Sequence, residues 1–364
     1  MSAFLTEHAP VYNGCRFCLM CRHVCPVGRT TKREANTPHG WALLIASVER
    51  GQMTWNAEAV DTLYQCAQCS LCLASCVTDR PLPSAIAAAR ADVVSIGAAP
   101  AAVSDLDAHL RQWGNPYQPL EPQPSTGAAP TALYVGADAH YLRPQTVTAA
   151  QRLLKALGIE HVLIGAGLSS AYLPHALGLR DTARVLGQSA LHDLATAGSS
   201  RLIVLTPRDA HAFQHVLPEL GLPLPDGIEV VDLMTLLAQG LETGRLKLRP
   251  VEESLTYHDP ALTPLFVARA ALARRVLAAL MTTPVREMFW REGRAAPGGT
   301  AGGLEFTHPQ LAQQMTQERL TEATATGADL LVTEDPVALA HLLTQANDSI
   351  RVEGLYELLA RQIS

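Results

Sequence analysis

The chain has 364 residues and a mass of about 39 kDa, which is enough for two or three domains of ordinary size. Hydrophobic residues make up 48% and charged residues 17%, so the chain can bury a sizeable core and is neither fibrous nor disordered. A net charge of −6 gives no support to nucleic-acid binding, because proteins of that class carry concentrated basic charge.

No apolar segment is long enough to predict a membrane-spanning helix. The best candidate, residues 266–281, is interrupted by Arg269, Arg274 and Arg275. The first ten residues lack the basic head and apolar run of a secretory signal. We therefore expect a cytoplasmic protein, which can still lie at the inner face of a membrane through a partner.

Cysteines dominate the chemistry of the N-terminal part. All eight lie in two sets with the same spacing, C-x2-C-x2-C-x3-C, so the unit is an internal duplication. The first set is Cys15, Cys18, Cys21 and Cys25, and the second is Cys66, Cys69, Cys72 and Cys76. In a cytoplasmic chain such spacing indicates metal ligation rather than disulfides.

The spacing predicts two [4Fe-4S] clusters. Three cysteines at two-residue intervals can wrap three corners of a cubane, and in two-cluster ferredoxins of this spacing the fourth cysteine ligates the other cluster. We therefore assign the first cluster to Cys15, Cys18, Cys21 and Cys76, and the second to Cys66, Cys69, Cys72 and Cys25. Structural zinc is the alternative, but it usually uses two separated cysteine pairs and needs no third cysteine at the same pitch.

Helices are expected between and after the cysteine sets. Thr37 can cap a helix that ends at Gly51, a second runs from Asn56 into Cys66, and a third begins near Ser84. These features predict an α-helical ferredoxin-like domain over residues 1–115. Apolar residues between the ligands are expected to shield the clusters from water: Phe17, Leu19, Met20, Leu71 and Leu73.

An α/β part follows. Residues 116–130, rich in Pro, Gly and Ser, predict a linker, and residues 131–364 alternate apolar runs with helical patterns. Helices are expected at 146–157 and 265–281, and strands at 132–135, 161–164, 201–205, 229–231, 254–257, 329–332 and, more weakly, 351–353. Because residues 201–217 resemble 328–343, we expect a duplicated α/β domain with parallel sheets.

The α/β part contains no complete catalytic motif. Neither G-x-G-x-x-G nor G-x4-G-K-[ST] occurs where a strand meets a helix, and no catalytic residue is assigned. Residues 295–303, AAPGGTAGG, are expected to form a flexible surface loop rather than a phosphate-binding loop. In TYHDPA, residues 256–261, we expect Asp259 to hold a turn by hydrogen bonds, with His258 beside it.

The motifs CRFCLMCRHVCP and CAQCSLCLASC resemble those of iron–sulfur proteins related to heterodisulfide reductase, such as iron–sulfur subunits of glycolate oxidase and anaerobic glycerol-3-phosphate dehydrogenase. The α/β part is similar to that family's duplicated cysteine-rich domain. No cysteine follows Cys76, so no further cluster is expected there. The family's cysteine positions correspond approximately to Ala137, His211, Ala261, Ala296, Pro297, Asp335 and Ala338.

The resemblance implies a non-catalytic electron-transfer subunit of an oxidoreductase complex. Its two clusters would take electrons from a flavin-dependent dehydrogenase and pass them to a quinone or another carrier, which can be membrane-associated. The α/β part would then be a scaffold. Two alternatives stay open: a self-contained reductase with an extra cofactor in the α/β cleft, and a cluster-based redox sensor or scaffold.

Overall fold

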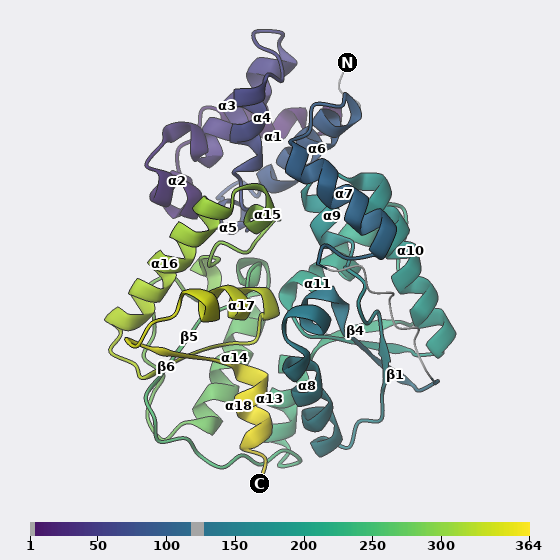
Figure 1. The fold of residues 1–364 in the computed structure, drawn as a ribbon, viewed down its shortest axis with the longest axis vertical. Coiled ribbons are helices and arrows are strands. Elements are labelled where there is room, and N and C mark those ends of the chain that lie inside the picture. Colours follow the sequence, from purple (N-terminus) through teal and green to yellow (C-terminus); the bar gives the residue numbers. More distant parts are fainter. Residues whose placement is uncertain (1–3, 118–126) are drawn as a thin grey trace.

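The computed structural model describes residues 4–117 and 127–364, in which a helical N-terminal part lies against two α/β halves (Figure 1). Most of the linker expected at 116–130 lies outside the described residues. Among the helices of the described ranges, none is both long and apolar enough to cross a membrane.

The N-terminal part is helical, the cap predicted at Thr37 is present, and Asn56 caps the helix expected to run from it. The Thr37 side chain accepts a hydrogen bond from the Gly40 N–H (3.3 Å), and the Asn56 side chain accepts one from the Ala59 N–H (2.9 Å). The helices are η1 (Thr6–His8), α1 (Ala9–Cys15), η2 (Arg22–Val24), α2 (Pro26–Thr31), η3 (Glu34–Asn36), α3 (Pro38–Glu49), α4 (Ala57–Tyr64), α5 (Leu71–Ala74), α6 (Leu82–Ser95) and α7 (Ala101–Trp113).

The first α/β half contains a parallel sheet of order β2-β1-β3-β4. Its strands are β1 (Thr131–Tyr134), β2 (Val162–Ile164), β3 (Arg201–Val204) and β4 (Glu229–Asp232). Its helices are η4 (Asp138–Leu142), α8 (Pro144–Ala156), α9 (Tyr172–Ala176), α10 (Arg180–Ala197), α11 (Pro207–His211), η5 (Ala212–Val216), α12 (Leu217–Glu219) and α13 (Leu233–Glu242).

The second half contains a smaller parallel sheet of order β5-β6-β7. Its strands are β5 (Leu255–Tyr257), β6 (Leu330–Thr333) and β7 (Arg351–Gly354). Its helices are η6 (Thr263–Leu265), α14 (Val267–Leu280), η7 (Glu292–Arg294), α15 (Leu304–Thr307), α16 (Pro309–Ala325), α17 (Pro336–Gln345) and α18 (Leu355–Arg361). The mixed α/β class with parallel sheets is therefore confirmed.

The similarity between residues 201–217 and 328–343 corresponds to the same local structure in both halves. In each, an apolar strand is followed by a helix with proline in its first turn, and the preceding polar residue caps that helix. Thr206 caps α11 after β3, and Asp335 caps α17 after β6.

Two large hydrophobic cores join the parts. One contains Leu63 and Ile86 of the N-terminal helices together with Leu177 of the first half and Met315 of the second. The other contains residues of both sheets and of the helices between them. The helical part therefore buries its apolar face against the α/β halves rather than only against itself.

The glycine-rich segment 295–303 differs from its prediction. All of its residues are buried, so it is not a flexible surface loop. Gly302 has φ +64, and a Cβ atom there would lie 2.8 Å from the Ala67 carbonyl oxygen, which is too close. The glycines let this segment pack directly on the loop that carries Cys66 and Cys69.

A second close approach gives a stability prediction. Gly178 has φ +84, and a Cβ atom there would collide with the backbone of Arg90 and Ala91 on α6. Gly244 has φ +70 but nothing within 4 Å of its Cβ position, so Gly244→Ala is a matched control. The free energy of unfolding of both variants should fall by about 1–2 kcal/mol, because alanine is strained in a left-handed backbone conformation. That of Gly178→Ala should fall by a further ~1–3 kcal/mol because of overpacking.

Chemical denaturation of the two variants measures this difference. Equal losses of unfolding free energy in Gly178→Ala and Gly244→Ala would contradict the close packing of α6 on the segment after α9.

Candidate iron–sulfur centre

Cys66 and Cys69 of the second set lie in a curled loop between α4 and α5, while Cys72 lies on α5 and Cys76 follows it. Gln68 (φ +50) and Ser70 (φ +61) both adopt left-handed conformations on either side of Cys69. Such alternation bends the chain and turns backbone N–H groups toward a common centre, which favours anionic groups. One of these N–H groups, that of Gln68, donates to the Cys66 sulfur at 3.4 Å.

Cys25 joins this loop from a different part of the chain. Four cysteines line a single pocket, together with Trp41 and neighbouring residues: Cys25, Cys66, Cys69 and Cys72. Cys25 caps α2, and its sulfur accepts a hydrogen bond from the Gly28 N–H at 3.5 Å. Burial raises the pKa of Cys25, and the nearby sulfurs of Cys69 and Cys66 raise it further.

The first cysteine set is closer to the surface, and Cys18 is exposed. Burial raises the pKa of Cys15 to about 11, and the neighbouring sulfurs of Cys21 and Cys76 raise it further. Cys76 therefore faces the first set, as Cys25 faces the second. Its own pKa is lowered, because hydrogen bonds from Thr78 and Arg80 outweigh the effect of burial.

Shielding of the first set differs from its prediction. Leu71 is fully buried, but Phe17, Leu19 and Met20 are 75%, 51% and 60% exposed. The first loop lies at the edge of the helical part, where the described chain supplies no second layer for these side chains to pack against. The prediction that they exclude water is therefore wrong for this chain by itself.

The four cysteines of this pocket are ligands of the kind that bind iron–sulfur clusters or zinc. Within the described ranges, no group of three or more His, Cys, Asp or Glu side chains is gathered as for one ion. The thiolates of a cubane instead surround a space, because each binds a different iron. The four-cysteine pocket has a free volume of about 20 Å³, so its side chains would have to move to admit a cubane.

Arg90 places a buried positive charge beside the second cysteine loop. Its side chain is fully buried and donates hydrogen bonds to the carbonyl oxygens of Ala176 (2.7 Å), Leu63 (3.0 Å) and Cys66 (2.7 Å). No carboxylate in residues 4–117 and 127–364 forms an ion pair with it. Burial lowers the pKa of Arg90, and the Cys66 sulfur opposes this shift more than any other neighbour does. A buried cation needs a nearby anion, and cluster thiolates would supply one.

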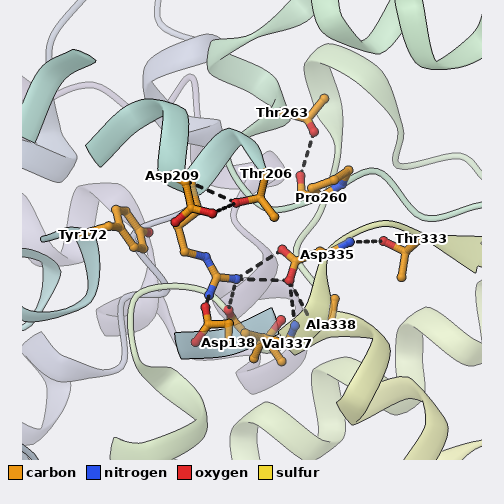
Figure 2. Close-up of polar contacts among 12 residues, drawn as sticks. Asp138, Tyr172, Thr206, Asp209, Pro260, Thr263, Thr333, Asp335, Val337 and Ala338 are labelled. Atoms are coloured by element: carbon orange, nitrogen blue, oxygen red, sulfur yellow. Dashed lines mark hydrogen bonds and ion pairs between the residues drawn. The ribbon is translucent and has the colours of Figure 1, made fainter. Parts of the chain in front are cut away.

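The cleft between the α/β halves is occupied by protein charges. Arg208 on α11 forms ion pairs with Asp138 of the first half (3.0 Å) and Asp335 of the second (3.1 Å), and Figure 2 shows these contacts. Asp335 also accepts hydrogen bonds from the backbone N–H groups of Val337 and Ala338. The adjoining cavity of about 20 Å³ has room for one water molecule.

Residues at the family's cysteine positions have varied surroundings. Ala137 and Asp335 lie around Arg208, whereas Ala296 packs with Val24 and Leu71 beside Cys21 and Cys69. Ala261 and Ala338 are buried, and Pro297 lines a groove with Arg29 of the helical part. His211 lies apart from Arg208's ion pairs, in a pocket beside the second cysteine loop.

Asp259 is expected from the sequence to hold a local turn, but residues 255–257 are strand β5 and Asp259 instead contacts two distant segments. Its carboxylate pairs with Arg274 and accepts a hydrogen bond from the Glu292 N–H at 3.1 Å. His258 is buried, and its Nδ1 atom accepts a hydrogen bond from Arg319 Nε at 2.9 Å. Burial lowers the pKa of His258, and Arg319 lowers it further.

Sequence reasoning missed Arg90, although it lies in the AARADVV run after the second cysteine set. A lone arginine in an alanine-rich helix carries no spacing signal, so only the fold reveals its burial. Sequence reasoning also missed the pocket around His211, because its residues come from seven separate helices and the second cysteine loop.

Comparisons with known proteins agree with the motifs. No protein-family model matches the chain. It is 24% identical over 326 residues to a subunit of the dihydromethanophenazine:CoB–CoM heterodisulfide reductase from Methanosarcina barkeri, and the match covers 84% of this chain and 79% of that protein. It is 23% identical over 365 residues to a subunit of the fumarate reductase (CoM/CoB) from Methanothermobacter marburgensis, covering 96% and 70%.

A solved structure shares the fold. The crystal structure of a hypothetical protein from Helicobacter pylori matches with a TM-score of 0.60 at 12% sequence identity, over 89% of this chain and 67% of that chain. The class is thus a mixed α/β protein with a cysteine-rich helical part. The chain is similar over most of its length to subunits of heterodisulfide reductase and fumarate reductase, so the resemblance inferred from its motifs is confirmed.

Arg90 gives a prediction for the site. Arg90→Met removes three hydrogen bonds to buried carbonyl oxygens, so the free energy of unfolding of anaerobically purified protein should fall by about 3 kcal/mol or more. Arg111→Met is the control, because Arg111 is 52% exposed and its ion pair with Asp107 should contribute about 1 kcal/mol or less. Denaturation curves showing equal losses would mean that Arg90 does not join the parts.

Proposed function

We propose that this chain is an electron-transfer subunit carrying two [4Fe-4S] clusters, one on Cys15, Cys18, Cys21 and Cys76 and the other on Cys66, Cys69, Cys72 and Cys25. The observation that carries this proposal is the pocket in which Cys25 meets the three cysteines of the distant second set. Each cluster would accept and donate one electron. The names of the relatives support a place in a multi-subunit reductase.

The protein's own groups would hold and tune the clusters. Backbone N–H groups of Gly28, Gln68 and Arg80 donate to cysteine sulfurs, which stabilises thiolate charge. Arg90 would place its positive charge beside Cys66. Because that charge is buried, it acts in a low-dielectric surrounding and favours the more negative, reduced cluster.

The two sets are close enough to form a path. Cys21 of the first set is among the groups that raise the pKa of Cys72, after burial itself and the nearer sulfurs. Cys21 and Cys69 also pack against the same apolar residues, Val24 and Leu71. An electron that enters at the exposed first loop can therefore pass inward to the buried second loop.

The exposed first loop is the proposed docking site for a partner. Phe17, Met20 and Val77 are 75%, 60% and 77% exposed, and Lys32 and Arg33 are exposed nearby. Apolar side chains rimmed by charge are typical of protein interfaces. We propose that a flavin-dependent dehydrogenase docks here and that its electrons leave to a quinone or another carrier, at the inner face of a membrane where the partner is bound to one.

Reductive titration tests the function and the ligand assignment together. The anaerobically purified chain should take up two electrons, one per cluster. Cys25→Ser should alter the magnetic spectrum of the cluster on Cys66, Cys69 and Cys72, and Cys76→Ser should alter the other, because each fourth cysteine faces the opposite set.

The two variants are matched controls for each other, since each removes one thiolate from the same motif position. If each substitution instead perturbs the cluster of its own triplet, the ligand assignment is wrong. If the wild-type chain takes up no electrons, the function is wrong.

A further inference from the structure

A second pocket lies beside the buried cysteine loop. It has a volume of about 430 Å³, within the range of small-molecule sites. Gln68 and Ser70, which flank Cys69, form one wall, and α6 contributes Pro83, Ser84 and Ala87. A molecule bound there would lie against the loop that holds the second proposed cluster.

The opposite wall gathers polar groups from four helices, α9, α11, η5 and α12. His211 and His215 have ring centroids 5.0 Å apart, and His175 Nε2 lies 3.0 Å from a Glu219 carboxylate oxygen. Tyr172 connects this wall to the cysteine loop by donating its hydroxyl hydrogen to the Gln68 carbonyl oxygen (3.4 Å). The buried Nδ1 atom of His211 has no hydrogen-bond partner among the described residues. Because that atom has almost no exposed surface, a molecule in the pocket would meet the exposed imidazole of His215 at this wall.

The charges of the lining determine the class of ligand. The residues that line the pocket in the described chain include no lysine or arginine. Burial lowers the pKa of His211 to about 4, so this imidazole is neutral at pH 7. Glu219 already pairs with Arg180 at 3.0 Å. A phosphate or other strong anion would find no cation, whereas a neutral molecule with carbonyl acceptors finds imidazole donors.

We propose that this pocket binds the head group of a quinone and is where electrons leave the chain. The apolar part of the wall, with Leu73, Val216 and Leu265, suits the ring, and the histidines suit the carbonyl oxygens. Binding is independent of the proposed function, whereas electron transfer to the bound quinone rests on it.

The reaction balances with the groups present. Reduction of a quinone consumes two electrons and two protons, and both carbonyl groups become hydroxyls. Each of the two reduced clusters gives up one electron to the quinone. Both protons come from water, through His215, which is exposed at the mouth, and His211 behind it.

Menadione, 2-methyl-1,4-naphthoquinone, is the probe for binding to the full chain by anaerobic calorimetry. The wild type should bind one molecule per chain. Ser84→Phe fills the pocket and should weaken binding at least tenfold, and His215→Gln, at an exposed position that tolerates substitution, should weaken it about three- to tenfold. His192→Gln, an exposed histidine on α10, is the control and should leave binding unchanged.

Absence of menadione binding, equal binding by Ser84→Phe and wild type, or preferential binding of the phosphate-bearing flavin mononucleotide would overturn the proposal. Stopped-flow oxidation of pre-reduced protein gives a second readout, and menadione should act at least tenfold more slowly on Ser84→Phe than on wild type at equal iron content. If Ser84→Phe contains iron and is oxidised by menadione at the wild-type rate, the pocket proposal is rejected and the cluster proposal is not. Histidine-dependent menadione binding by protein without iron supports the pocket and rejects the cluster proposal.

Discussion

The structure depends on one buried cation. Arg90 lies on α6 with no exposed surface, and its guanidinium connects the cysteine loop to the end of α9 through carbonyl oxygens on both sides. Burying such a charge without a counterion costs several kcal/mol. We propose that the counterion is the cluster on the second cysteine set. Binding of the cluster would then stabilise the contact that Arg90 makes between the helical part and the α/β part. The positive-φ Gly178 lets the α/β part approach α6 closely enough for this contact.

Other buried arginines of the chain are neutralised in a different way. Arg208 has Asp138 and Asp335, and Arg269 has Asp232 and Glu334. These pairs lie within and between the α/β halves, where the resembling family has cysteines and this chain has none. The charges of Arg208 and Arg269 are thus balanced by carboxylates of the α/β part itself, in contrast to that of Arg90.

Much of the fold follows from local pattern. All seven expected strands are present within a residue or two, because buried parallel strands read as short apolar runs between turn signals. Thr37 caps its helix as expected, since capping needs only neighbouring residues, and the helix expected from Asn56 begins there. The internal similarity correctly indicated that β3–α11 and β6–α17 are equivalent.

The predictions that the structure contradicts concern residues whose surroundings are determined by contacts between distant segments. Segment 295–303 looks flexible in sequence, yet its glycines serve close packing on the cysteine loop. Phe17 and Met20 look like shielding residues, but whether a side chain is covered depends on what lies opposite it. The domain boundary expected at residue 115 and the cluster ligands remain predictions, while Arg90 and the histidine-lined pocket emerge only when α6, α9 and α11 come together.

Iron and acid-labile sulfide analysis of the anaerobically purified chain tests the central claim most directly. Two cubanes predict about eight iron and eight sulfide per chain. Zinc at one or two per chain without labile sulfide would contradict the account, because the cysteine sets would then hold single ions and could not carry electrons.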